Sequence, residues 1–176
     1  MAKKVAVLAV NPVNGMGLFQ YLETFYENGI PYTVFAVADD RRIKTNSGVV
    51  LEADAVISDL KGREDEFDAL VFSCGDAVPV FADHATESYN VDLMEVLRTF
   101  GEKGKIMAGH CAAALMFDFA GVSGGKRVAV HPLAKAAVKK GIATDADSEI
   151  DGNFYTAKQE HTIWTMMPKL VEELKK

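Results

Sequence analysis

The sequence contains few cysteines and no long apolar run. Its 176 residues include only two cysteines, Cys74 and Cys111. Two cysteines cannot build a disulfide framework, so we expect a reducing, cytoplasmic location. No apolar stretch approaches the ~20 residues needed to span a bilayer, which argues against a membrane protein. The apolar run near the N-terminus breaks at Asn11-Pro12 and lacks a small-residue cleavage site, so it predicts a buried strand and not a secretory signal.

Basic residues are also too few for a nucleic-acid-binding face. The chain has 19 Lys and Arg against 25 Asp and Glu, which gives a formal net charge of −6. Nucleic-acid-binding proteins usually carry a basic patch. The densest basic group, at 41–44, directly follows two aspartates and is typical of a solvated loop. We therefore expect no nucleic-acid partner.

The common metal and cofactor motifs are missing as well. The chain contains neither His-Glu-x-x-His nor Cys-x-x-Cys, the usual metal-site signals. Gly15 and Gly17 follow the first predicted strand, but the Gly-x-Gly-x-x-Gly spacing of a dinucleotide site is absent. The sequence predicts neither a resident metal nor a cofactor.

Strand and helix patterns alternate along the chain. Apolar runs typical of buried parallel strands occur at 5–10, 32–37, 68–73, 105–108 and 127–130. Helical spacing of apolar residues occurs at 18–26, 91–100, 112–120, 132–140 and 163–174. Short strands are predicted at 49–51 and 55–57, and a hairpin at 148–150 and 154–157. The alternation predicts one doubly wound α/β domain over residues 1–176.

Cys111 is the strongest candidate for a chemically reactive residue. It lies where the strand at 105–108 turns into the helix at 112–120. The unpaired N–H groups and the positive dipole end of a helix N-terminus both favour a thiolate over a thiol. This placement predicts a reactive cysteine. The alternative is that Cys111 is simply a small buried hydrophobic residue.

Several stretches together resemble the DJ-1/PfpI superfamily, which is class I glutamine amidotransferase-like. They are the opening strand–helix–strand unit, the strand and turn at 68–75, the elbow at 109–114 and the hairpin at 151–153. The most specific stretch is His-Pro-Leu-Ala-Lys at 131–135, which begins 20 residues after Cys111. The resemblance implies a flavodoxin-like three-layer sandwich with a mostly parallel central sheet. It also implies a homodimer or a higher homo-oligomer.

The resemblance further implies roles for individual residues. Cys111 would be the nucleophile, held in a strained turn at the carboxyl ends of the strands. The backbone N–H groups of Gly75 and Ala112 would form an oxyanion hole. His131 would lie near the nucleophile as a possible acid or base.

Three positions depart from the pattern of that family. Gly17 stands where an acidic residue on the first helix should hydrogen-bond the thiol, and Glu23 lies too far along the helix to replace it. Cys74 replaces a glycine of the family's Pro-Gly-Gly turn. His110 stands where an apolar residue is usual. Since adjacent residues in a turn point in different directions, we expect His110 to face away from the site.

Four residues are candidates for an accessory role. Cys74 could form a reversible disulfide or a shared metal site with Cys111, or could simply fill space in the turn. Glu160 and His161 could replace the missing acid and base, or could form a helix N-terminus. His110 is the fourth candidate.

The sequence therefore leaves two classes of function open. One is a cysteine-dependent enzyme, either a hydrolase of the peptidase-like kind or a glyoxalase/deglycase-like enzyme acting on small carbonyl compounds. The other is a non-enzymatic redox sensor or ligand-binding protein that uses the same cysteine. The expected partner is a small substrate or oxidant, and a degenerate site reassigned to another ligand is a third reading.

Overall fold

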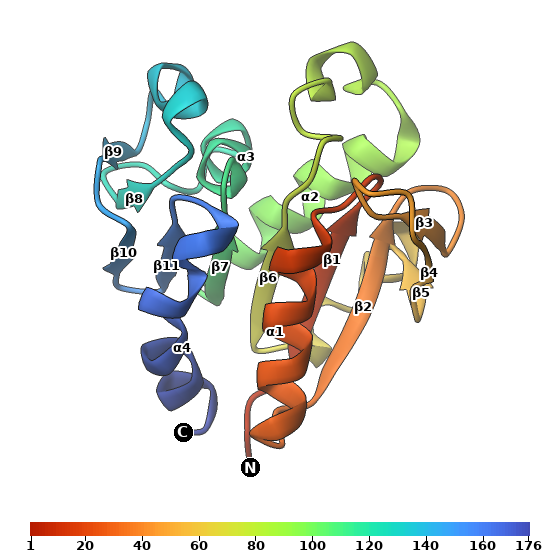
Figure 1. The fold of residues 1–176 in the computed structure, drawn as a ribbon, viewed down its shortest axis with the longest axis horizontal. Coiled ribbons are helices and arrows are strands. Elements are labelled where there is room, and N and C mark those ends of the chain that lie inside the picture. Colours follow the sequence, from red (N-terminus) through yellow and green to blue (C-terminus); the bar gives the residue numbers. More distant parts are fainter.

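A seven-stranded sheet forms the centre of the molecule (Figure 1). The computed structural model describes residues 1–176. The strand order is β10-β11-β7-β6-β1-β2-β5. These strands are β1 (Val5–Val10), β2 (Tyr32–Val37), β5 (Ala55–Val56), β6 (Ala69–Ser73), β7 (Ile106–His110), β10 (Ser148–Asp151) and β11 (Phe154–Ala157). All neighbouring pairs are parallel except β10 and β11. The predicted α/β class and mostly parallel sheet are confirmed.

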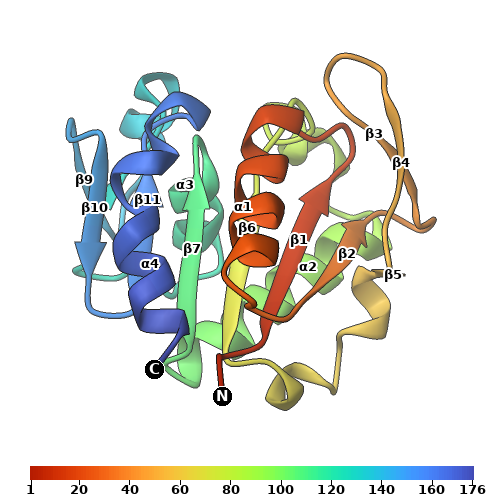
Figure 2. The ribbon, with the colours of Figure 1, turned by 60° about the horizontal axis from the view of Figure 1, so that its bottom comes forward.

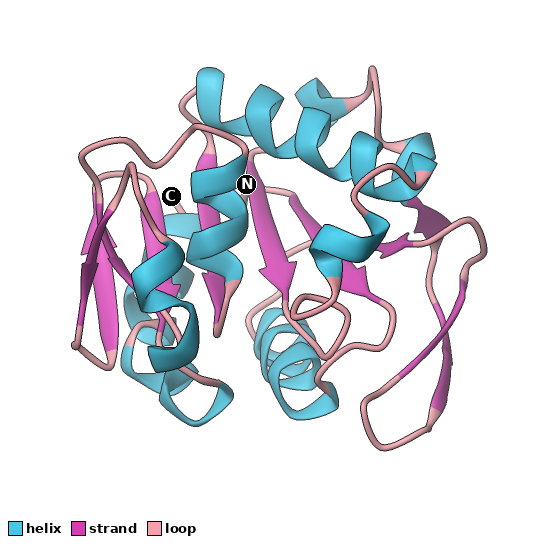
Figure 3. Ribbon diagram, turned by 90° about the horizontal axis from the view of Figure 1, so that it is seen from above, coloured by secondary structure: helices cyan, strands magenta, loops and turns pink.

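Helices cover both faces of this sheet and complete the three predicted layers. Figure 2 shows α1 and α4 in front of the strands and α2 behind them, and Figure 3 shows helices on both sides of the sheet. The four α-helices are α1 (Gly15–Glu27), α2 (Ser88–Glu102), α3 (Ala113–Phe119) and α4 (Met167–Leu174). Because both faces are covered, the central strands read as continuous apolar runs, and every residue of β1 is buried. No helix is both long and apolar enough to cross a membrane.

Two small sheets lie beside the main one, and the sequence patterns predicted only part of each. The segments β3 (Arg42–Lys44) and β4 (Val50–Glu52) form an antiparallel hairpin, although residues near 42–44 were expected to be a loop. The predicted strand at 127–130 is β8 (Arg127–Ala129), and it pairs in parallel with β9 (Ile142–Thr144) outside the main sheet. Such short, half-exposed strands have little apolar pattern to identify them.

Two predicted helices were wrong in extent. The helix expected at 132–140 is a 3₁₀ segment, η4 (Pro132–Ala137), which ends where Val138 becomes extended. The helix expected at 163–174 is divided into a 3₁₀ segment, η5 (Glu160–Thr165), followed by α4. Pro168 lies in the first turn of α4, where a missing N–H costs nothing, so proline marks a helix start and not a kink.

A buried carboxylate explains why the chain after η4 is not helical. Asp118 on α3 is 3% exposed, and it accepts backbone N–H bonds of 2.8–2.9 Å from Lys139, Lys140 and Gly141. Burial by itself raises the pKa of Asp118, but these donors and the Ser123 hydroxyl outweigh it and hold the pKa below its ordinary value. One carboxylate thus fixes the end of the 131–141 segment against α3.

We expect Asp118→Asn to lower the free energy of unfolding by about 1.5–3 kcal/mol at pH 7, because the amide loses an ionised acceptor for these N–H groups. The lowered pKa means that this contribution is present above the ordinary value of about 3.9 and is lost as the pH falls through the folded-state value. Urea unfolding of the wild type and of Asp118→Asn at several pH values measures this contribution to the free energy of unfolding.

The difference in the free energy of unfolding between the wild type and Asp118→Asn should therefore become smaller as the solution is acidified. Asp145→Asn is the matched control, because that carboxylate belongs to the same region but is 89% exposed and pairs only with surface lysine. Equal effects of the two substitutions would contradict the role given to Asp118.

Candidate active site

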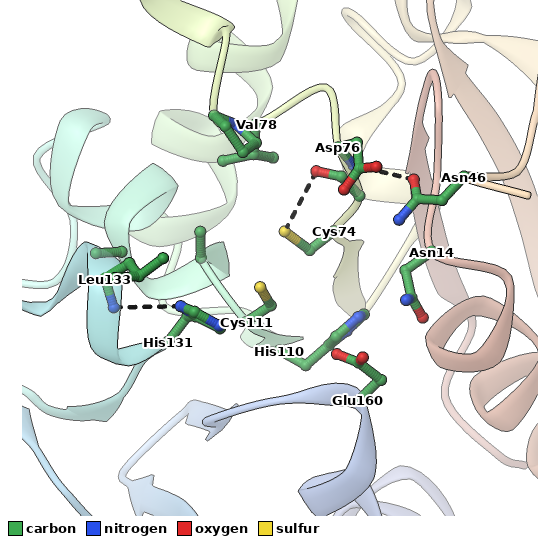
Figure 4. Close-up of a pocket in the computed structure, with 14 residues that line it drawn as sticks. Asn14, Asn46, Cys74, Asp76, Val78, His110, Cys111, His131, Leu133 and Glu160 are labelled. Atoms are coloured by element: carbon green, nitrogen blue, oxygen red, sulfur yellow. Dashed lines mark hydrogen bonds between the residues drawn. The ribbon is translucent and has the colours of Figure 1, made fainter.

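A cavity of about 400 Å³ opens at the carboxyl ends of four parallel strands (Figure 4). Its walls come from the loops that follow β1, β6, β7 and β11, together with η4. The strand order reverses between β1 and β6, and α/β proteins bind ligands at such a switch point. The lining residues are Asn14, Asn46, Cys74, Gly75, Asp76, Val78, Pro79, His110, Cys111, Ala112, His131, Leu133, Ala134 and Glu160.

Cys111 has a strained backbone just before the N-terminus of α3. Its φ angle is 59°, and it is the one residue other than glycine with a positive φ. This left-handed conformation costs about 1–2 kcal/mol for a residue with a side chain. Two hydrogen bonds hold it: the Cys111 N–H donates to the Ala157 carbonyl at 3.0 Å, and the Cys111 carbonyl accepts from His131 N–H at 2.8 Å. The predicted strand-to-helix elbow is confirmed.

The second cysteine lies directly beside the first. The two sulfur atoms lie next to each other in Figure 4, where the Cys74 thiol donates to the Gly75 carbonyl at 3.9 Å. The Cys74 side chain, with help from the Ala112 N–H, holds the pKa of Cys111 below its ordinary value, against burial and the negative charges of Glu160 and Asp76. Cys74 is therefore the neighbour that favours the thiolate of Cys111, which is the effect expected of the missing acid.

Cys74 itself is held in the thiol form. It is 2% exposed. The neighbouring Cys111 and its own burial raise the pKa of Cys74 well above the ordinary value. Both cysteines are free. The thiol of Cys111 therefore ionises before that of Cys74, and the two cysteines are neighbours in the cavity wall.

Gly75 is required by close packing of two loops. A Cβ atom at this position would overlap the carbonyl oxygen of Pro12 and the backbone of Val13. The β6 loop can therefore approach the β1 loop only with glycine here. The backbone N–H groups of Gly75 and Ala112 lie close to the sulfur of Cys74, and both lower its pKa against the larger effects of Cys111 and burial. Their role as an oxyanion hole stays a prediction.

His131 stands at the start of η4, on the cavity wall. Its Nδ1 accepts a hydrogen bond from the Leu133 N–H at 3.2 Å, so the side chain caps the 3₁₀ segment. An acceptor at Nδ1 places the proton of the neutral ring on Nε2. His131 therefore presents an N–H donor, not a base, to the cavity.

His110 does not face away from the site, so that prediction was wrong. Its side chain is 1% exposed and belongs to the cavity lining. A Cβ atom at Gly17 would overlap Nε2 and Cε1 of His110, so the imidazole fills the space where an acidic side chain on α1 would lie. Burial lowers the pKa of His110 to about 3, and the ring is neutral at physiological pH.

The remaining predicted residues separate into two groups. Glu160 lines the cavity, and its backbone carbonyl accepts from the Gln20 side chain at 2.9 Å, which ties η5 to α1. His161 does not line the cavity: its side chain is 63% exposed, and its Nε2 lies 3.7 Å from the carboxylate of Glu160. Glu23 is also exposed, as expected for a residue farther along α1.

Three polar residues of the cavity, Asn14, Asn46 and Asp76, were missed by the sequence reasoning. Asn14 caps α1 by accepting from the Gly17 N–H at 2.6 Å, and Asn46 accepts from the Asp76 N–H at 3.1 Å. Asn14 carries a helix-cap signal, since asparagine precedes the first turn of α1. No local pattern identifies Asn46, because only the tertiary fold brings the β3–β4 hairpin to this edge of the sheet.

Comparisons with known proteins agree with this architecture. A sequence model described as the DJ-1/PfpI family matches residues 3–173. The chain is 73% identical to protein ppBat of Bacteroides thetaiotaomicron over 175 residues, which covers 99% of this chain and 100% of that protein. The crystal structure of the "putative protease I" from Bacteroides thetaiotaomicron has a TM-score of 0.98 at 73% identity, over 99% and 100% of the two chains. Drosophila melanogaster DJ-1beta shares the fold at 22% identity, with a TM-score of 0.85 over 99% and 91%.

The effect of the Cys74 side chain on the pKa of Cys111 predicts how Cys111 reacts with iodoacetamide as the pH changes. Cys74→Ala removes the donor, so the alkylation profile of Cys111 should move to higher pH and the rate at pH 6 should fall at least several-fold. Cys74→Ser is the matched control, because a hydroxyl keeps a donor at nearly the same place. Mass spectrometry of the labelled peptide gives the rate at each pH, and equal shifts in both variants would contradict this role.

Proposed function

The chain belongs to the DJ-1/PfpI family, and we propose that it is a cysteine-dependent enzyme acting on small, uncharged carbonyl compounds. The observation that carries the proposal is the strained Cys111, whose lowered pKa is maintained by a neighbouring thiol inside a ligand-sized cavity. A thiolate, not a thiol, is the nucleophile of cysteine enzymes. A perturbed pKa inside a cleft is a common mark of an active site.

The size of the cavity favours small substrates over polypeptides. A volume of about 400 Å³ lies near the lower end of the range for small-molecule pockets. One similar structure is called a "putative protease I", but that name describes the Bacteroides protein. For this chain, the cavity supports the glyoxalase/deglycase-like reading more than the peptidase-like hydrolase reading.

The first step of the proposed reaction is addition of Cys111 to the carbonyl carbon. A C–S bond forms and the π electron pair of the C=O bond moves to oxygen. The N–H groups of Gly75 and Ala112 stabilise this oxygen. Cys111 is now bonded to carbon and is no longer a thiolate. The Cys74 thiol then gives its proton to the oxygen, so the negative charge ends on Cys74.

Later proton transfers need a base, and Glu160 is the group that we assign to this role. Its carboxylate faces the cavity, whereas His131 presents an N–H donor because its Nδ1 is occupied by the Leu133 N–H. His131 would then orient an oxygen atom of the substrate. General acid–base groups contribute about 10²–10⁴-fold to a rate, so Glu160→Gln should lower kcat by that factor.

The charge of the cavity selects against anionic substrates. Its lining includes the carboxylates of Asp76 and Glu160 and contains no lysine or arginine. Both carboxylates raise the pKa of Cys111, which shows that their field reaches the sulfur. An anionic carbonyl compound would be repelled by the same field.

We expect Cys111-dependent turnover of methylglyoxal, with kcat/KM at least about tenfold higher than for the anion glyoxylate, since one repulsive contact of ordinary strength has this effect. Cys111→Ala should abolish turnover. Asp76→Asn combined with Glu160→Gln should reduce the preference for the neutral compound, measured as the ratio of the two kcat/KM values. Turnover that survives Cys111→Ala, or its absence from a panel of neutral aldehydes, would refute the proposed enzyme.

The paired sulfurs favour a second candidate function, reversible oxidation. In this reaction the Cys111 thiolate attacks one oxygen of a hydroperoxide, forming a sulfenic acid and releasing an alcohol. Cys74 then attacks the Cys111 sulfur, forms a disulfide and releases water. A dithiol reductant would restore the pair. The closeness of the two sulfurs in Figure 4, together with the effect of each cysteine on the pKa of the other, supports this reading over a sensor with a single cysteine.

Stoichiometric hydrogen peroxide should therefore produce a Cys74–Cys111 disulfide in the wild type. The intact mass should fall by about 2 Da, for two hydrogens lost, and dithiothreitol should reverse the change. Cys74→Ser lacks the second sulfur, so when a second equivalent of peroxide is given to both proteins, the Cys111 sulfenic acid of the variant should be oxidised to sulfinic acid. Equal amounts of sulfinic acid in both proteins would exclude the disulfide, and disulfide formation without turnover of any carbonyl compound would favour the redox function.

A further inference from the structure

A second cavity lies between the sheet and α2, beside the candidate active site. Its volume is about 340 Å³, and it is enclosed by residues of β1, β2 and β6, the segment 77–84 and helices α2 and α3. Val78 lines both cavities, so the two share one part of their walls. Neither cysteine lines the second cavity, and the proposed chemistry of Cys111 makes no use of it.

The walls of this second cavity are mostly apolar and partly aromatic. They include the buried side chains of Phe72 and Leu93 and the half-buried rings of Phe81 and Tyr89. No aspartate, glutamate, lysine or arginine lines the cavity. Small-molecule sites have volumes of about 300–1,000 Å³ and combine apolar walls with a few placed polar groups. The cavity therefore suits a small, uncharged ring compound.

The cavity has an opening to solvent at the 3₁₀ segment η3 (Phe81–His84). Val80, just before this segment, is 44% exposed, and His84 at its end is also exposed. Both residues line the cavity. A ligand can therefore enter beside η3 without passing through the active-site cavity.

One polar side chain in the wall has an acceptor without a partner. Asn90, in the first turn of α2, is 7% exposed. Its Nδ2 donates to the His84 carbonyl at 2.9 Å, and because a carbonyl can only accept, this bond fixes the orientation of the amide. No protein group donates to Oδ1. This oxygen is also not one of the two fully buried side-chain atoms without a partner, Ser73 Oγ and His110 Nε2. Oδ1 is therefore an accessible, unpaired acceptor on a residue that lines the cavity.

We propose that this cavity is a second ligand site, which binds a small, uncharged aromatic compound through one N–H or O–H group. The donor of the ligand bonds Oδ1 of Asn90, and its ring packs among Phe72, Phe81 and Tyr89. A ligand with an acceptor at that place would set two acceptors against each other, which costs free energy on burial. The site is independent of the chemistry proposed for Cys111.

Indole and benzofuran are matched probes for this site, because they have nearly the same shape and differ in an N–H group against a ring oxygen. We expect indole to bind with a Kd of about 1 mM or tighter, and about 3–10-fold more tightly than benzofuran, the usual effect of one hydrogen bond. Asn90→Leu should remove this difference by weakening the binding of indole alone. Isothermal titration calorimetry of the wild type and the variant measures each Kd.

Three results of this titration would overturn the inference. They are no saturable binding of indole, equal affinities of the two probes for the wild type, and an unchanged ratio of the two affinities in Asn90→Leu. An equal loss of both probes in the variant belongs to the last case, because it would show that the amide only maintains the shape of the cavity.

Two measurements without an Asn90 variant identify the cavity that is occupied. In NMR spectra of the wild type, indole should shift the side-chain amide resonances of Asn90 and leave those of Asn46, which lines the first cavity, unchanged. Alkylation of Cys111 with iodoacetamide fills part of the first cavity, so the affinity for indole should be the same after it. A shift of Asn46 without Asn90, or loss of indole binding after alkylation, would place the probe beside Cys111 and overturn the inference. Carbonyl turnover is assayed separately, and its outcome bears on the proposed function alone.

Discussion

The left-handed backbone of Cys111 is the constraint on which the site depends. A positive φ at the end of β7 turns the chain sharply into α3 and directs the sulfur into the cavity. The hydrogen bonds to the Ala157 carbonyl and from the His131 N–H link this turn to β11 and to the segment before η4. Because Asp118 fixes the far end of the same segment, the cavity wall is tied to α3 at both ends.

Two other side chains take the place of the acidic residue that is missing from α1. A carboxyl group on α1 would both fill space near Cys111 and donate to its sulfur. Here the imidazole of His110 fills the space above Gly17, and the side chain of Cys74 lowers the pKa of Cys111. Gly17 and His110 are therefore one coupled change, since a side chain at position 17 would overlap the imidazole.

This exchange also alters the chemistry that the cavity offers. A thiol can become a disulfide partner, which a carboxyl group cannot, so the proposed nucleophilic and redox reactions would both use the same pair of sulfur atoms. Two carboxylates and no lysine or arginine line the cavity, and the buried imidazole of His110 is neutral. Association of two copies stays a prediction from the family resemblance.

The sequence alone determined the parallel core and the elbow, because continuous apolar runs such as Val5–Val10 and the small residues around Cys111 carry local signals. It could not determine the direction of His110, the contact between Cys74 and Cys111, or the place of Asn46. Those depend on how loops from separate strands meet at one sheet edge, at distances that no sequence spacing encodes. The short 3₁₀ form of η4 also depends on a tertiary contact. The carboxylate of Asp118 accepts hydrogen bonds from backbone N–H groups that would otherwise bond within a longer helix.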